Sequence, residues 1–117
     1  MRFLTKKQKV LLALIREFSR KNMSSKLGIE KGLFILKQEE NMQDFVKFYS
    51  FLPYKLGPYS YVSYRDISQL KLEGYLNEDE KSITKKGEDV IKDIDAKVTD
   101  KIKRTAERFD SDQHLKN

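Results

Sequence analysis

The sequence predicts a single, mainly α-helical domain that carries one small β-hairpin and ends in an extended helix. Apolar residues recur at helical spacing in four segments, most of which follow a residue suited to cap a helix. Between the third and fourth segments, two short apolar pairs flank an acidic turn, which is the pattern of a hairpin. A length of 117 residues with 38% hydrophobic residues fits one modest core and leaves no room for a second domain.

The first two helices are expected before residue 38. Thr5 and Gln8 have the spacing of a capping box, and the helix that they begin should cover roughly residues 6–21. Its apolar stripe consists of Leu11, Leu14, Ile15 and Phe18. A second helix should end near Lys37 or Gln38, because Ile29, Leu33 and Leu36 have helical spacing. Within it, Gly28 and Gly32 each cost about 1 kcal/mol relative to alanine.

The third helix should follow an irregular, partly extended connection over residues 39–58. Ser60 is suited to cap this helix, and Gly74 to end it. Tyr64, Ile67 and Leu70 form its expected inner face.

A short β-hairpin and a long last helix complete the predicted fold. Tyr75-Leu76 and Ser82-Ile83 would pair across the acidic tip of residues 77–80. Thr84 would then cap a helix over about residues 84–109, followed by a frayed tail at 110–117. Three acids precede a base by four residues on this helix, which is the favourable order for surface ion pairs. They are Glu88 with Lys92, Asp93 with Lys97, and Asp100 with Arg104.

Charge and composition limit the function classes. Net charge is +6, and residues 1–37 hold ten Lys and Arg against two Glu, a balance of +8 that admits nucleic acid, an anionic membrane surface or an acidic protein as partner. There is no cysteine, and the one histidine, His114, lies in the expected tail, so we expect no enzyme, no metal site and no cofactor. The apolar run Val10–Ile15 is too short for a signal peptide or a membrane span, which predicts a cytoplasmic protein.

The run from Tyr61 to Gly87 resembles the recognition helix, hairpin wing and following helix cap of winged helix-turn-helix regulators. Residues 1–109 would form this winged-helix domain, and the resemblance implies duplex DNA as partner, with the exposed helix face in the major groove. Arg65 and Gln69 suit contacts to guanine and adenine, whereas the acidic wing would repel phosphates. The expected DNA-binding residues are Ser63, Arg65, Ser68, Gln69 and Lys71 on this helix, with Lys6, Lys7 and Lys9 near the start of the chain.

A narrower resemblance covers most of the chain. Residues 31–36, 51–60 and 70–76 resemble the YwgA-like family of uncharacterised bacterial and archaeal proteins, and Gly57-Pro58-Tyr59-Ser60 is the sharpest motif. More distantly, Lys31-x-Leu33-Phe34 followed by Gly57-Pro58 is similar to the Panacea antitoxin domain. The resemblance implies a winged-helix regulator, sometimes the N-terminal module of a larger protein, and it supplies no ligand or reaction. The Gly57–Ser60 motif suits either a turn that delivers the Ser60 cap or a loop that binds a ligand or partner.

The last helix is expected to pair two copies of the chain. Ile102 and Phe109 lie among lysines and arginines, and a three-helix core with one hairpin offers no obvious cover for them. Burying such side chains between two chains contributes about 1.5–3 kcal/mol each. The expected dimerisation residues are Ile94, Val98, Ile102 and Phe109.

Two functional hypotheses follow from these patterns. The leading one is a dimeric transcriptional regulator that binds duplex DNA, which the basic first third of the chain favours. The alternative is a protein-interaction module, such as an antitoxin-like or defence-associated adaptor or the N-terminal domain of a longer protein. The acidic wing and the nearly neutral third helix favour the alternative.

Overall fold

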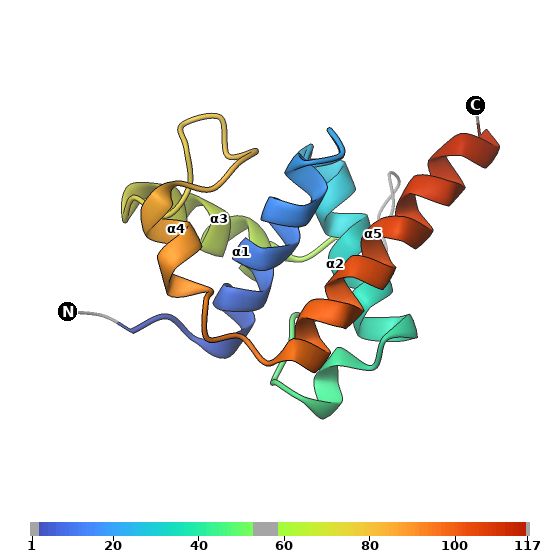
Figure 1. Ribbon diagram of the computed structural model, residues 1–117, viewed down its shortest axis with the longest axis horizontal. Helices are drawn as coiled ribbons and strands as arrows, with labels where there is room; N and C mark the ends of the chain where they lie inside the picture. Colours follow the sequence, from blue (N-terminus) through green and yellow to red (C-terminus); the bar gives the residue numbers. More distant parts are fainter. Residues whose placement is uncertain (1–2, 53–58, 117) are drawn as a thin grey trace.

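A computed structural model of the chain describes residues 3–52 and 59–116, with side chains as far as Phe109. The regular elements in these ranges are five α-helices and one 3-10 turn, without any β-strand (Figure 1). In chain order they are α1 (Lys6–Ser19), α2 (Lys26–Glu39), η1 (Met42–Asp44), α3 (Tyr61–Leu72), α4 (Lys85–Val90) and α5 (Ala96–Lys116). In the sharpest sequence motif, Gly57 and Pro58 lie outside the described residues.

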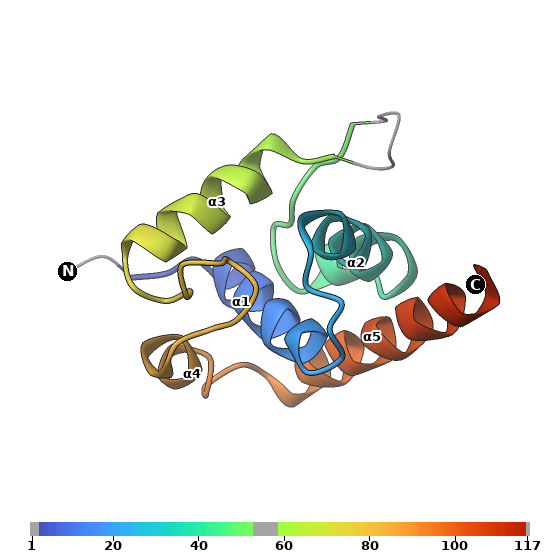
Figure 2. The ribbon, with the colours of Figure 1, turned by 90° about the horizontal axis from the view of Figure 1, so that it is seen from above.

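Helix α1 lies at the centre of the molecule, with the other four helices around it (Figure 2). The predicted capping box begins it: the Gln8 backbone N–H donates to Thr5 Oγ1 at 3.2 Å, and the Thr5 N–H donates to Gln8 Oε1 at 3.1 Å. Every residue from Val10 to Ile15 is buried, so α1 is apolar on nearly all sides rather than along one stripe. The helix that the sequence marks as amphipathic is therefore the axis of the core.

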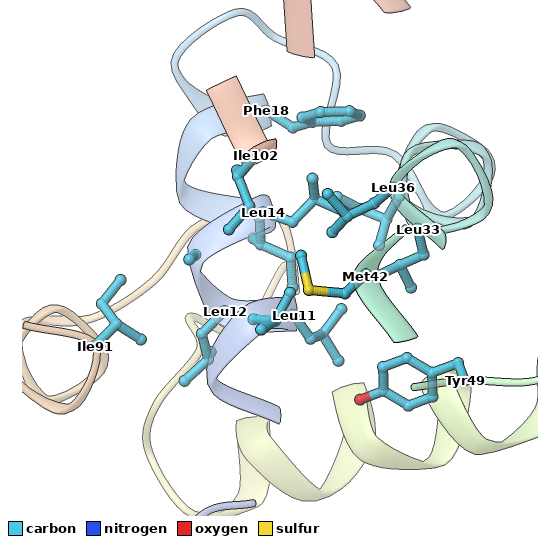
Figure 3. Packing of buried hydrophobic residues seen from close by; sticks show 14 of the residues in the cluster. Leu11, Leu12, Leu14, Phe18, Leu33, Leu36, Met42, Tyr49, Ile91 and Ile102 are labelled. Atoms are coloured by element: carbon cyan, nitrogen blue, oxygen red, sulfur yellow. The ribbon is translucent and has the colours of Figure 1, made fainter. Parts of the chain in front are cut away.

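The core is built where α2 and α5 pack against α1. Leu33 and Leu36 of α2 meet Leu11 and Leu14 of α1, with Met42 filling the space beneath them (Figure 3). Helix α5 closes the other side of α1 with four buried apolar side chains, which are Val98, Ile102, Ala106 and Phe109. The rings of Phe18 and Phe109 lie 5.3 Å apart at this contact.

Several predicted helix ends are confirmed. Ser60 Oγ accepts the Ser63 backbone N–H at 3.3 Å and caps α3, as predicted. Ser25, for which no cap was predicted, caps α2 in the same way. Gly74 follows α3 with a φ of +85°, a conformation that only glycine adopts without strain. These signals are local in sequence, which is why they transfer directly to the fold.

The predicted β-hairpin is wrong, and with it the winged-helix class. In the described residues, Leu76 and Ile83 form one isolated antiparallel bridge and no strand. The acidic tip bends back onto the helices instead of extending the ladder: Glu80 has a φ of +61° and lies 3.2 Å from Lys71 Nζ and 3.6 Å from Lys26 Nζ. Ser24 Oγ also donates to the Lys81 carbonyl at 2.7 Å. These contacts hold the 77–82 turn against the body, so it cannot project as a wing.

The single helix expected over residues 84–109 is divided into α4 and α5, and α5 continues to Lys116. Asp95 begins α5, because its carboxylate accepts the Lys97 backbone N–H at 2.8 Å. The acids expected to pair four residues along the helix instead bind other helices: Glu88 pairs with Arg16, and Asp93 with Lys9. Arg104 likewise binds Glu40 rather than Asp100, through Nε and Nη2 at 3.1 and 3.0 Å.

Candidate interaction surface

The outer face of α3 exposes both apolar and charged side chains. Tyr61 and Leu72 are 71% and 79% exposed, and they stand on the same side of the helix because eleven residues make about three turns. Arg65 lies between them, exposed and without an ion pair among the described residues. We call this surface the α3 face; it consists of Tyr61, Arg65, Ser68, Gln69 and Leu72.

The inner face of α3 is held by buried hydrogen bonds rather than by apolar contacts alone. Glu30 of α2 accepts hydrogen bonds from the Ser60 backbone N–H at 3.1 Å and from the Ser63 hydroxyl. One turn further, Asp66 accepts the Tyr49 hydroxyl at 2.7 Å, in the region where Figure 3 shows the Tyr49 ring beside α3. These two carboxylates fix the rotation of α3 and so determine which residues face outward.

The prediction that Ser63 contacts DNA is wrong, because Ser63 is fully buried and cannot reach a groove. The apolar stripe assigned from Tyr64, Ile67 and Leu70 fits Ser63, Ile67 and Leu70 equally well, since both sets have helical spacing. In the structure the second set faces inward and Tyr64 is half-buried at its edge. Arg65, Ser68 and Gln69 are exposed, as expected.

Glu30 is the residue that sequence reasoning missed. A glutamate beside lysines normally marks a solvated helix face, yet Glu30 is 2% exposed. Burial raises its pKa, and the hydrogen bonds from Ser63 and Ser60 oppose that shift without cancelling it. Burial also raises the pKa of Tyr49, and the nearby Asp66 carboxylate adds to the shift, so Tyr49 remains a neutral donor. The one sequence signal that could have indicated a buried acceptor is Ser63, a polar residue that continues the inner stripe of α3.

Tyrosine rings extend the α3 face at its N-terminal end. The Tyr59 ring lies 4.8 Å from Tyr61 and 4.8 Å from Tyr64, at steep interplanar angles that favour aromatic contact. Lys26 Nζ stands 5.3 Å from the Tyr64 ring centroid. Leu52, bridged to Tyr59 through both backbone hydrogen bonds, is 58% exposed beside this cluster. The α3 face therefore continues into an apolar, tyrosine-rich patch.

The other predicted DNA-contact cations do not share this surface. Lys71 is bound by Glu80, and Lys7 lies over the Tyr49 ring at 5.1 Å. Lys6 and Lys9 line a hollow at the start of α1, where they stand with Ile94 and Val98 from the predicted dimerisation set. The residues expected to contact DNA are thus divided between the α3 face and the start of α1.

The dimerisation residues mostly belong to the chain's own core. Val98, Ile102 and Phe109 are no more than 5% exposed, because α1 and α2 cover them. Only Ile94 remains half-buried, at the hollow just described. The reason for expecting a dimer, that these side chains lack cover within one chain, does not hold.

Comparisons of the chain with protein-family profiles, with curated proteins and with solved structures find no match. Among the described residues there is no cluster of side chains able to hold a metal ion. Nor does any described helix have the length and apolar character that crossing a membrane requires. The resemblance to the YwgA-like family stays a prediction.

Replacing Glu30 with glutamine should remove one pH-dependent contribution to stability. Because the folded-state pKa of Glu30 is raised above its ordinary 4.5, the folded chain holds a proton that the unfolded chain has lost, and stability falls as pH rises through that interval. The glutamine side chain keeps an oxygen acceptor and has no proton to lose. We therefore expect the difference in melting temperature, Glu30→Gln minus wild type, to increase as the pH is raised from 4.5 to 8. A difference that stays constant over this range would contradict the raised pKa of Glu30.

Proposed function

We propose that this domain is a protein-interaction module whose α3 face, with the adjoining tyrosine patch, binds an acidic protein. The observation that carries the proposal is the exposure of Tyr61 and Leu72 on either side of Arg65. Tyrosine and arginine are the residues that most often dominate binding energy at protein interfaces. At the N-terminal end of α3, Tyr61 meets the Tyr59 ring and the exposed Leu52, and contiguous exposed apolar surface of this kind often marks a protein interface.

The charge of the chain supports an acidic partner. The chain carries a net charge of +6, and Arg65 is the charged group at the centre of the α3 face. Asp66, the acid next to it in sequence, is buried and engaged by Tyr49, so it does not cancel Arg65 at the surface. A partner with a carboxylate flanked by apolar residues would meet Arg65, Tyr61 and Leu72 together.

A photo-crosslinking residue at position 72 should capture this partner in cells, whereas the same residue at Lys97, an exposed position on α5, should not. The captured protein is then purified and titrated against full-length variants by calorimetry. We expect Leu72→Asp and Tyr61→Asp to weaken the affinity at least about 10-fold, since central interface residues contribute about 2 kcal/mol or more. Lys97→Asp places a carboxylate outside the surface and lowers the net charge by two units rather than one, so it is a strict control for charge and should bind like wild type. Equal affinities for all three variants would reject the α3 face as the binding surface.

Duplex DNA is the second candidate partner, because Arg65, Ser68 and Gln69 are exposed together on α3. These residue types can read base edges, but neighbouring phosphate contacts are also needed, and Lys71 is held by Glu80. Two measurements separate the two functions: the crosslinking at position 72, and DNA binding by wild type and Arg65→Ala. Under the DNA hypothesis, mixed duplexes bind at about 50 mM salt and lose affinity steeply as salt rises. Binding of DNA by wild type that Arg65→Ala weakens, with no protein captured at position 72, would favour this second function.

A further inference from the structure

A hollow of about 280 Å³ opens between the start of α1, the residues after η1 and the turn between α4 and α5. Its floor is apolar and consists of Val10, Val46, Ile94 and Val98. Val10 and Val98 belong to the buried core, whereas Val46 and Ile94 are only half-buried at the opening. Phe45, 41% exposed, stands at one edge. The hollow thus offers an apolar surface, near the lower end of the size range of ligand sites, that the chain itself does not cover.

The rim of this hollow carries four charged side chains, of which three are already engaged. Lys9 and Asp93 bind each other at 3.1 Å, and the Asp95 carboxylate accepts the Lys97 backbone N–H at the start of α5. Lys6 is exposed and has no ion pair or hydrogen bond among the described residues. The four rim charges sum to zero, but Asp95 faces the N-terminus of α5, whose N–H groups offset part of its charge, so Lys6 is the rim charge without a direct partner among the described residues.

The surroundings hold several lysines and the exposed acid Asp44, which directly precedes Phe45. Lys47 follows Val46 directly and Lys97 lies two residues after Asp95, and both are exposed without an ion pair in the described part of the chain. Lys101 Nζ lies 5.0 Å from the Phe45 ring centroid. An apolar floor beneath one free ammonium group, with further lysines nearby, suits a ligand with an apolar body and one anionic head.

We propose that this hollow binds a small amphipathic carboxylate, with its hydrocarbon chain on Val46 and Ile94 and its carboxylate on Lys6. The site is separate from the α3 face and does not depend on the function proposed for that face. Lys6 and Lys9, predicted as phosphate contacts, and Ile94 and Val98, predicted as dimer contacts, then belong to one small-molecule site.

Octanoate is a suitable probe, because it has a flexible apolar chain and one carboxylate. Titrated into the isotopically labelled 117-residue chain, it should shift the amide resonances of Val46, Ile94 and Val98 and leave those of the α3 face unchanged. Lys6→Gln should raise the octanoate Kd up to about 5-fold, because the carboxylate would pair with an exposed ammonium group that water and salt screen. Octan-1-ol, which has the same chain without the charge, should bind wild type more weakly by a similar factor.

Lys103→Gln is the matched control, because Lys103 is an exposed lysine of α5 that does not line the hollow. It should bind octanoate with the wild-type Kd, and both variants change exposed side chains and should remain folded. Absence of resonance shifts up to about 10 mM octanoate would overturn the proposal. So would shifts spread over unrelated surfaces, or a Kd that Lys6→Gln and Lys103→Gln raise equally.

Discussion

Replacing Ile102 with aspartate should unfold the chain. Ile102 is 3% exposed and packs against α1 from the middle of α5, so the substitution removes a core side chain and buries a carboxylate without a partner (Figure 3). The expected loss exceeds about 4 kcal/mol, which is most of the stability of a small domain. The far-ultraviolet circular dichroism of the variant should show loss of helix at about 25 °C, and urea denaturation of wild type gives the reference.

Lys103→Asp is the control for this substitution, because it adds the same carboxylate to the adjacent, exposed position. Its free energy of unfolding should stay within about 0.5 kcal/mol of wild type. Sedimentation equilibrium adds an independent readout of the role first predicted for Ile102. A folded, monomeric Ile102→Asp beside a dimeric wild type would show that Ile102 acts between chains rather than within one.

The contact between Phe18 and Phe109 should produce the second large effect. Each is buried, and their rings meet at 5.3 Å with an interplanar angle of 39°, so each Phe→Ala substitution should cost about 3–5 kcal/mol. If the double variant retains a measurable transition, a double-mutant cycle in urea should give a coupling energy of about 0.5–1.5 kcal/mol.

Phe34→Ala and Phe51→Ala provide the comparison for this cycle. Their rings also contact each other, at 5.6 Å, but both side chains are only half-buried. Each single substitution should therefore cost clearly less than its counterpart at Phe18 or Phe109. Equal costs for the two pairs would mean that α5 does not close the core at Phe109.

Local signals in the sequence predicted the helix ends, whereas long-range contacts decided what it missed. The caps at Thr5 and Ser60 and the stop at Gly74 depend on groups within a few residues, so spacing alone was enough. The hairpin failed because Glu80 binds Lys26 and Lys71, which are 54 and 9 residues away in sequence and cannot be located before the fold is known. The break between α4 and α5 is an exception, because the Asp95 cap is also local: its carboxylate accepts the Lys97 N–H two residues away, and the continuous apolar pattern of the last helix obscured this signal.

The candidate surface was predicted in part, for the same reason. Helical spacing placed Arg65, Ser68 and Gln69 on one side of α3, but it could not choose between Ser63 and Tyr64 as the inward residue. That choice depends on Glu30, which is buried. Because glutamate is rarely buried, nothing in the sequence was a reason to expect it there. Nor could spacing show that lysines at the start of α1 meet Ile94 across the hollow, because these residues are far apart along the chain.

Helix α5 is translated after every other element of this fold, yet it covers one whole side of α1. A ribosome that has released residues only as far as Asp95 presents an α1 whose Leu14 and Phe18 still lack the side chains that α5 supplies. Nascent chains in that interval expose apolar surface of the kind that associates with other chains or with chaperones. Premature termination just before Ala96 should therefore give insoluble product, whereas termination after Phe109 should not.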